Sequence, residues 1–421
     1  QIILPKTVSY QAHPDRTKSP DDVEIKLTKS AITRLSNNLP EAYNYKELGE
    51  TWSAPRIFRL PNTGAGDNNI EDDIYVAVMG GGYGGRDDKV GSALFVVNLE
   101  DNITPGKLEK VISIKDEVNL PIVNSVPGTP VVITPDVARG INFTGALVYV
   151  NDFEGKITKF NLTNMQNDGF GKSIKLYDST LLLNIKADRT NGRYQYHSMD
   201  AGIGRTSKNF WMFSGTGDYE RLTSKISGID NIMFGFRDKD YPRFRKYDDP
   251  VTIRNNLAKC MDTTGDTLGV KCPLTTKDID RATRSVKDLG WYINLPNSQK
   301  VTAEPTISGG LVYYPIFEPS ASANQCSLGL ALICAVDDEC GKNVSSQLGS
   351  LKDQKIDGQV YSGKTCYAVG QGVLSRLVVF ANKLFANIAG KSVQDKTDLV
   401  VIDPGESDIE SFRNSWREGN F

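Results

Sequence analysis

The sequence predicts an all-β protein and, within that class, a β-propeller with irregular insertions between its blades. Glycine and proline, with 38 and 19 residues in 421, interrupt the chain frequently. The apolar segments between these breaks are short and rich in β-branched and aromatic residues, which is typical of strands. Similar pairs of segments recur along the chain, and imperfect repetition of several-stranded units over about 400 residues favours radially stacked blades.

The clearest strands come in neighbouring pairs, and we expect each pair to be a hairpin-like unit. These pairs are 74–79 with 93–98, 146–150 with 156–162, 209–214 with 231–236, 311–316 with 328–336, and 377–388 with 398–402. A large sandwich, or two sandwiches, would show a similar periodicity and stays open as an alternative. Helical patterning is sparse, and only residues 278–289 have the apolar spacing of one surface helix between blades.

Composition narrows the classes of partner. With 49 Lys+Arg against 51 Asp+Glu, the net charge is −2, so no bulk attraction to nucleic acid or anionic lipid is expected. No apolar run approaches the ~20 residues that a membrane-spanning helix requires. Large all-β folds often form one domain, and we expect a single propeller domain over residues 1–421. Since the sequence starts at Gln1 without a leader, any signal peptide is expected to have been removed or to lie outside it.

The six cysteines predict a local disulfide framework in an oxidising compartment. A zinc site is disfavoured, because zinc sites use close pairs such as C-x-x-C, whereas the closest spacing here is Cys334-x5-Cys340. Connectivity stays open, and we favour Cys260 with Cys272 because that bond would close a polar loop. The cysteines are Cys260, Cys272, Cys326, Cys334, Cys340 and Cys366.

Two patterns that are found in enzymes are better interpreted here as structural features without a catalytic role. The run Gly80–Gly85 (GGGYGG) contains G-x-G-x-x-G after a strand, but a polar turn and another strand follow it instead of a helix. We therefore interpret it as a glycine-rich hairpin loop and not as a dinucleotide site. The only histidines, His13 and His197, lie outside any nucleophile motif, and His197 is expected to be a hydrogen-bonded structural residue. No catalytic residue is proposed.

Acidic loops are the most suggestive chemical feature. Asp67, Asn69, Glu71 and Asp73 alternate before a strand and could direct several oxygens at one hard cation, Ca2+. The alternative is an exposed, charged hairpin tip. A second acidic run, Asp337-Asp338-Glu339, lies between two cysteines, where the short loop is expected to keep it exposed.

Aromatic runs at 210–213 and 291–293 are expected to supply core between blades. Tyr83 and Tyr219 lie in glycine-rich loops, where we expect exposed rings that could contact a partner or a glycan.

Several segments, in order, resemble the C-terminal half of the type IV pilus PilC/PilY family. They are YVAVMGGGYGG (75–85), SALFVVNLE (92–100), VYVNDFEGKITKFNL (148–162), FWMFSGTGDYERL (210–222), FGFRDKD (234–240), the stretch at 290–320, ALICAVDDECG (331–341) and FRNSWRE (412–418). Each is a strand-and-turn pattern of modest specificity, but their common order over nearly the whole chain makes the match specific.

The resemblance implies a modified seven-bladed propeller, the C-terminal region of a longer exported protein whose N-terminal half is absent from this sequence. It also implies a place at the pilus tip, outer membrane or cell surface of a Gram-negative bacterium. There the protein would promote pilus extension by opposing retraction and act in adhesion. The implied partners are pilins or minor pilins, and a host-cell receptor or glycan.

Calcium regulation is a further implication of the resemblance. Many relatives carry a D-x-D-x-D-G-x-x-D-like loop just before the strand equivalent to VYVNDFEG. Here the corresponding stretch, 134–142, keeps Asp136 and Asn142 but lacks the alternating carboxylates. On chemistry alone, the loop from Asp67 to Asp73 is the substitute.

Two other functions remain as alternatives to this non-enzymatic role. A quinoprotein-like periplasmic dehydrogenase is also a calcium-binding propeller, but many such enzymes have a vicinal disulfide, and no Cys-Cys pair occurs here. A secreted glycan-binding or glycan-cleaving propeller would need carboxylates clustered at the propeller centre with hydrolase spacing.

Overall fold

Consecutive strands of the chain build antiparallel sheets one after another, as the sequence predicts for an all-β protein. The structure is a computed structural model. It describes residues 43–61, 73–84, 90–100, 106–114, 124–135, 143–185, 193–205, 208–225, 231–247, 251–252, 258–259, 289–296, 298–320, 328–339, 341, 344, 348, 355–356, 359–360, 366–389 and 399–403.

In the first three sheets, four antiparallel strands pair side by side in the order of the sequence, although β12 and β13 come between β11 and β14 in the third. Sheet one contains β1 (Arg56–Leu60), β2 (Ile74–Gly80), β3 (Ala93–Asn98) and β4 (Leu108–Ser113). Sheet two contains β5 (Val131–Ile133), β6 (Gly145–Asn151), β7 (Lys156–Thr163) and β8 (Ser179–Asn184), with β12 (Val251–Thr252) parallel to β8. Sheet three contains β9 (Asp200–Ile203), β10 (Phe210–Gly215), β11 (Ile232–Asp238) and β14 (Gly290–Asn294), with β13 (Ala258–Lys259) parallel to β14.

The remaining sheets are also antiparallel but do not keep this order throughout. Sheet four contains β15 (Lys300–Val301) and β16 (Thr306–Ser308), which both pair with β17 (Leu311–Glu318), followed by β18 (Leu330–Asp337) and β21 (Cys366–Gln371). Sheet five contains β22 (Val373–Leu374), β23 (Val378–Phe380), β24 (Lys383–Ala389) and β25 (Leu399–Ile402). The strands β19 (Lys355–Ile356) and β20 (Gln359–Val360) form a separate two-stranded sheet.

The predicted strand pairs are confirmed as antiparallel neighbours, with one correction. Residues 377–388 are not one strand but two, β23 and β24, which pair with each other. The chain reverses at Ala381 and Asn382, whose φ angles are 48° and 59°. Two successive residues with positive φ make the tight hairpin turn whose twist suits antiparallel strands. The sequence gives only a weak indication of this hairpin turn, because the turn lacks the usual glycine.

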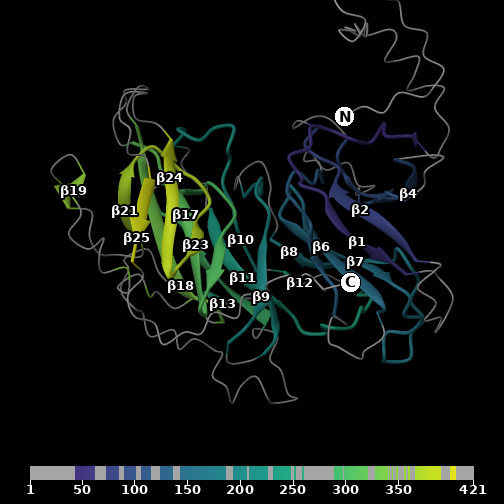
Figure 1. Cartoon of the computed structure of the whole chain (residues 1–421). Coiled ribbons are helices and arrows are strands. Elements are labelled where there is room, and N and C mark those ends of the chain that lie inside the picture. The colour runs from purple at the N-terminus through teal and green to yellow at the C-terminus, as the bar shows by residue number, and fades with distance from the viewer. Residues whose placement is uncertain are drawn as a thin grey trace, which may run out of the picture.

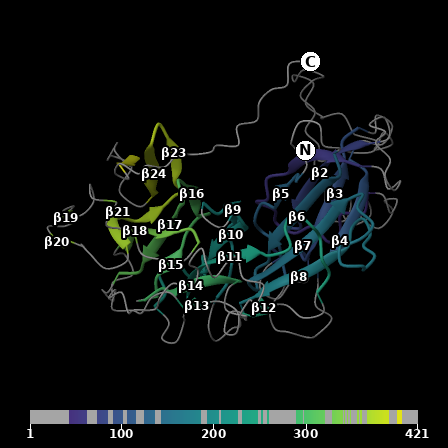
Figure 2. The same ribbon diagram turned by 90° about the horizontal axis from the view of Figure 1, so that it is seen from below.

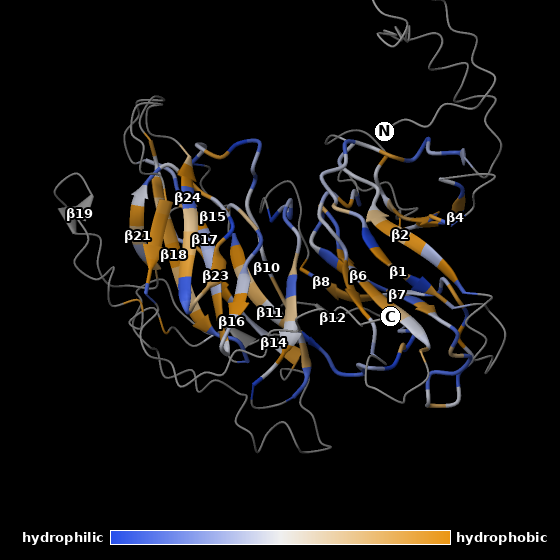
Figure 3. Cartoon of the chain, viewed as in Figure 1, coloured by the Kyte–Doolittle hydropathy of each residue, from blue (hydrophilic) through white to orange (hydrophobic). Residues whose placement is uncertain are grey.

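The meandering sheets stack side by side, and the core lies between them. Figures 1 and 2 show sheets one and two together, sheets four and five together, and sheet three between the two groups. Strands β6, β7, β10 and β11 are buried along their whole length, because sheets two and three each pack both faces against neighbouring sheets. Strands β6 and β10 consist mainly of apolar residues, whereas β7 alternates apolar and polar side chains and buries both; Figure 3 shows the strands of the core as hydrophobic bands between polar loops.

Some expectations concern residues that the structure does not describe. The surface helix at 278–289, apart from Leu289, and the bond between Cys260 and Cys272 lie outside the described residues. The described sheets have the form of propeller blades, and the count of seven blades stays a prediction. Among the described residues, none belongs to a helix long and apolar enough to cross a membrane.

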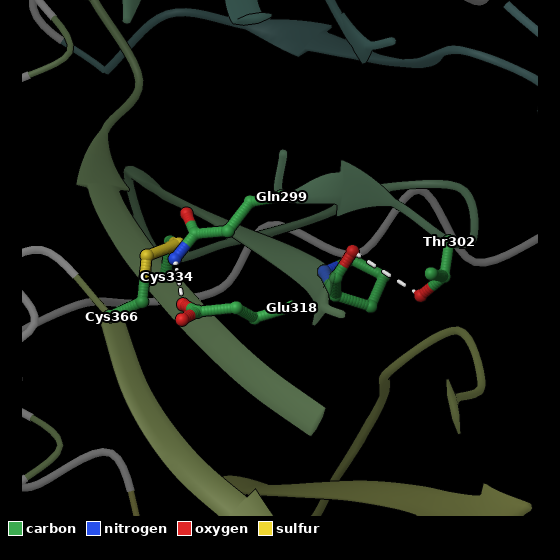
Figure 4. The surroundings of a disulfide bond; sticks show 6 residues. Gln299, Thr302, Glu318, Cys334 and Cys366 are labelled. Carbon is green, nitrogen blue, oxygen red and sulfur yellow. Dashed lines mark hydrogen bonds between the residues drawn. A yellow bond between two sulfur atoms is a disulfide. The ribbon is translucent and has the colours of Figure 1, made fainter. Parts of the chain in front are cut away.

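One disulfide joins neighbouring strands of sheet four. Cys334 on β18 pairs directly with Cys366 on β21, and their sulfur atoms are bonded (Figure 4). At the end of β17 in the same sheet, four residues beyond the strand position opposite Cys334, the Gln299 side-chain amide donates a hydrogen bond of 2.6 Å to Glu318 Oε2. The disulfide closes a loop of about 32 residues and should stabilise the folded state by about 3–4 kcal/mol.

A buried ion pair connects sheets two and three. Lys159 Nζ on β7 lies 2.5 Å from Asp238 Oδ2 on β11, and both side chains are 1% exposed. The Tyr149 hydroxyl donates to the same oxygen at 2.9 Å, and Lys159 also donates to the Arg243 carbonyl oxygen. Burial and the charge of Asp238 raise the pKa of Tyr149 well above its usual value. Since the pair is fully desolvated, each charge depends on its partner.

Removal of one charge should therefore be far more damaging than removal of both. Lys159→Met leaves the Asp238 carboxylate buried without its cation and should lower the free energy of unfolding by about 3–5 kcal/mol. The double variant Lys159→Met/Asp238→Asn keeps an acceptor for Tyr149 and should recover at least half of that loss in urea unfolding. The surface variant Lys107→Met, whose pair with Glu109 is 3.6 Å and partly exposed, should cost less than about 1 kcal/mol. If the single and double variants lost the same free energy of unfolding, the charge of one partner would not depend on the other, and this explanation of the contact between sheets two and three would be wrong.

Candidate functional site

Loops at one end of the sheets are joined to one another by backbone hydrogen bonds. Linkers that lead into the next sheet alternate with hairpin loops that connect the two central strands of a sheet. We call this series the loop chain. Its bonds are Tyr83 N to Glu50 O (2.7 Å), Gly82 N to Val126 O (2.9 Å), Phe153 N to Ser125 O (2.7 Å), Gln195 N to Phe153 O (3.2 Å), Gly217 N to Tyr194 O (2.9 Å) and Val301 N to Thr216 O (3.1 Å).

The glycine-rich segment after β2 is the first hairpin of the loop chain. Gly82 has a φ of 91°, and a Cβ atom there would lie 2.7 Å from the carbonyl group of Glu50. Only glycine permits this approach, which allows Tyr83 to exchange two backbone bonds with Glu50. The next described element is β3, which pairs antiparallel with β2, so the interpretation as a hairpin loop is confirmed.

The second hairpin, Asp152 to Gly155, contains a buried network of charged and polar side chains. The Asn124 amide donates to Asp152 Oδ2 and to Glu154 Oε2, both at 2.9 Å. Lys156 Nζ lies 2.7 Å from Glu154 Oε2, and the Lys156 backbone N–H donates to Asp152 Oδ1. All four side chains are less than 9% exposed. The network fixes the hairpin against the linker that carries Asn124.

Burial is the largest influence on the pKa of Asp152 in this network. It raises the pKa of Asp152 to about 7, although Lys156 and the hydrogen bond from Asn124 act in the opposite direction. The carboxyl group of Asp152 therefore takes up a proton near neutral pH, well above its ordinary range.

An aromatic cluster fills the space beneath these loops. Its buried members are Tyr83, Phe153, Tyr194 and Tyr196, contributed by both hairpins and by the linker to β9. Phe153 stacks on Tyr194 with ring centroids 4.6 Å apart and meets Tyr196 edge-on at 4.8 Å. The expectation of an exposed ring is wrong for Tyr83, which is 7% exposed, and confirmed for Tyr219, which is 44% exposed. Tyr83 is buried because distant loops pack over it.

A buried lysine forms hydrogen bonds with the backbone of the loop after β10. Lys300 Nζ donates to the carbonyl oxygens of Leu222 at 2.8 Å and Ser224 at 2.9 Å. Burial lowers the pKa of Lys300 to about 8. These bonds fix the position of the segment that contains Tyr219.

His197 packs as a structural residue at the border of the cluster. Its ring meets Tyr219 edge-on at 5.2 Å, and its carbonyl oxygen accepts a 2.9 Å hydrogen bond from the Asn151 amide. Burial lowers the pKa of His197 to about 4, so its imidazole is neutral at physiological pH.

The predicted calcium ligands are mostly outside the described residues. Asp67, Asn69, Glu71, Asp136 and Asn142 fall there, and only Asp73 can be placed. Its Oδ2 atom forms a 2.9 Å ion pair with Arg59 Nε at the start of β2. Within the described part of the chain, no group of three or more His, Cys, Asp or Glu side chains could hold a metal ion. A calcium site at either loop stays a prediction.

The second acidic run is buried, which corrects the expectation that it is exposed. Asp338 and Glu339 are each 5% exposed, since the turn after β18 folds against sheet three. There the indole N–H of Trp291 donates a hydrogen bond of 2.9 Å to the Asp338 carbonyl oxygen. Burial, with the neighbouring Asp337 and Glu339, raises the pKa of Asp338 to about 7.

Sequence reasoning missed most of the side chains that build this face. The buried partners Asn124, Asp152, Glu154 and Lys300 carry no local motif, because their roles depend on contacts between loops distant in sequence. Trp52, which is 61% exposed, could have been noticed as an isolated tryptophan in a polar stretch.

The raised pKa of Asp152 predicts a pH-dependent stability. The folded state binds this proton more tightly than the unfolded chain, so the contribution of Asp152 to stability falls as pH rises from about 4 to about 7. Asp152→Asn should therefore gain stability relative to the wild type as pH rises from about 5 to about 8, by about 2.7 kcal/mol, because about two units of the pKa shift lie in this pH range at about 1.4 kcal/mol per unit. Urea unfolding at both pH values measures this. Glu100→Gln, at an exposed site, is the matched control, and a difference that is constant with pH would refute the raised pKa.

Comparisons with known proteins agree with the fold. No protein-family model matches the chain. A Xylella fastidiosa protein described as "Type IV pilus biogenesis factor PilY1 homolog" is 22% identical over 333 residues, which are 75% of this chain and 21% of that protein. The chain thus spans about a fifth of the length of this relative.

A solved structure shows the same architecture. The C-terminal domain of Pseudomonas aeruginosa PilY1 superposes with a TM-score of 0.53 at 15% identity, over 86% of this chain and 73% of that one. The β-propeller class predicted from the sequence is confirmed by this likeness. The chain is thus similar in sequence to a PilY1 homologue and in fold to the C-terminal domain of PilY1.

Proposed function

We propose that this chain is the propeller region of a type IV pilus biogenesis factor and that it acts through protein contacts, not catalysis. The observation that carries the proposal is the match with the Xylella fastidiosa pilus biogenesis factor over 333 residues. The shared fold with the PilY1 C-terminal domain supports the same assignment.

The construction of the loop face suits a binding role. Backbone bonds connect hairpins and linkers from the first four sheets, so the face is fixed before a partner arrives. A preorganised surface loses little conformational entropy on binding. The carboxylates of Asp152 and Glu154 are buried and engaged with Asn124 and Lys156, an arrangement that fixes the hairpin.

The proposal includes the finer roles that the family resemblance implies. The protein would be exported, contact pilins or minor pilins, promote pilus extension by opposing retraction, and contribute to attachment to host cells or other surfaces. Calcium bound near Asp67 and Asp73 would regulate these contacts. The quinoprotein-like and glycan-specific alternatives gain no specific observation from the described residues, and we do not propose them.

Genetic complementation in the source bacterium tests this role. Deletion of the gene should remove most surface pili, and deletion of the pilus retraction motor in the same strain should restore them, because unopposed retraction would be the cause of their loss. The measurement is a count of pili by electron microscopy, with the wild-type gene returned on a plasmid as the control. A complementing gene with Asp67→Ala/Asp73→Ala tests the calcium proposal and should give fewer pili.

Normal piliation in the deletion strain would contradict the proposed function. Pili that stay absent after removal of the retraction motor would refute opposition to retraction and indicate a role in assembly itself.

A further inference from the structure

Two exposed aromatic side chains lie on the loop face. Trp52, in the linker before β1, is 61% exposed, and Tyr219, in the loop after β10, is 44% exposed. Large aromatic side chains with this exposure are characteristic of binding surfaces. The other described tryptophans, Trp211 and Trp291, are completely buried in the core, so the exposure of Trp52 is not a general property of the fold.

Both rings rest on a buried aromatic layer. Trp52 stacks on Tyr83 with centroids 5.9 Å apart and an interplanar angle of 21°. Tyr219 lies against Tyr196 at 6.3 Å and against His197 at 5.2 Å. Tyr83 and Tyr196 touch each other at 5.8 Å, so the two exposed rings flank one continuous layer.

Side-chain hydrogen bonds fix this layer. The Tyr83 hydroxyl donates a hydrogen bond of 2.5 Å to Glu220 Oε1, and the Tyr196 hydroxyl donates one of 3.3 Å to Asp218 Oδ1. The first bond joins the hairpin after β2 to the loop after β10, although these residues are 137 positions apart. One face of Trp52 lies on Tyr83, and its high exposure leaves the opposite face open to a ligand.

Carboxylates accompany both exposed rings. Tyr219 lies between Asp218 and Glu220 in the sequence, and the exposed Glu50 precedes Trp52 by two residues. Two described cations act on Asp218: Arg221, which is half exposed and lies 4.0 Å from it, and the buried Lys300, which attracts its charge. Aromatic faces carry negative charge density, so they and the carboxylates attract the same kind of ligand, a cation.

We propose that Trp52 and Tyr219 form a platform for lysine or arginine side chains in a basic segment of a partner protein. The cationic group would lie over an aromatic face, with Glu220 and Glu50 providing a complementary charge at the border. Anionic ligands such as phosphates would be repelled by the same carboxylates. The assignment rests on the platform itself and holds whether or not the chain acts in pilus biogenesis.

A labelled peptide of alternating glycine and arginine is the direct probe, and fluorescence anisotropy measures its affinity for the purified chain. Trp52→Ala and Tyr219→Ala should each weaken binding about threefold to thirtyfold, the range of a cation–π contact. Glu220→Gln should weaken binding by a few fold at low salt and less at high salt. Phe380→Ala is the matched control, since Phe380 is 65% exposed on β23 and should not alter binding.

The same peptide with citrulline in place of arginine separates charge from shape. Citrulline is nearly isosteric but neutral, and its peptide should bind at least tenfold more weakly than the arginine peptide. Unchanged thermal melting of each variant confirms that it is folded. Equal affinity for the two peptides, or unaltered binding by Trp52→Ala and Tyr219→Ala, would overturn the proposal. So would an absence of arginine-peptide binding together with binding of a neutral oligosaccharide that Trp52→Ala abolishes.

Discussion

The backbone hydrogen bonds of the loop chain are the constraint on which the arrangement of the first four sheets depends. Each sheet is a local meander, and nothing within a meander determines where the next sheet lies. The bonds from Gly82 to Val126, from Phe153 to Ser125 and from Gly217 to Tyr194 supply that information, because each joins a hairpin to a linker. They also satisfy backbone groups that would otherwise be buried without partners.

The interior between the sheets adds specificity to this constraint. Apolar packing supplies most of the stabilising free energy but is tolerant of sliding, whereas the ion pair between Lys159 and Asp238 requires one alignment of β7 with β11. The aromatic layer around Tyr83 and Phe153 has a similar role at the loop face. The same contacts that hold the sheets in register therefore give the face its fixed shape, and a fixed shape is what a binding protein needs.

The sequence predicts the strands well because hydrophobic patterning and turn residues are local. The hairpin of β6 and β7 illustrates this, since its apolar run and its Asp152 to Gly155 turn are contiguous. The burial of Tyr83 and Asp338 was not predictable, because each lies in a polar or glycine-rich segment that only distant elements cover. Partnerships such as Lys159 with Asp238, 79 residues apart, leave no trace in any short window.

Native-state hydrogen exchange tests most directly whether the loop chain holds the sheets together. The amides of Gly82, Phe153, Gln195 and Gly217 lie in loops, where exchange is normally fast. If the loop chain is a structural constraint, these amides should share one opening free energy, close to that of the core strands β6 and β10, and respond alike to low denaturant. Exchange of each amide by a separate, low-energy local opening, while the core strands stay protected, would contradict the account.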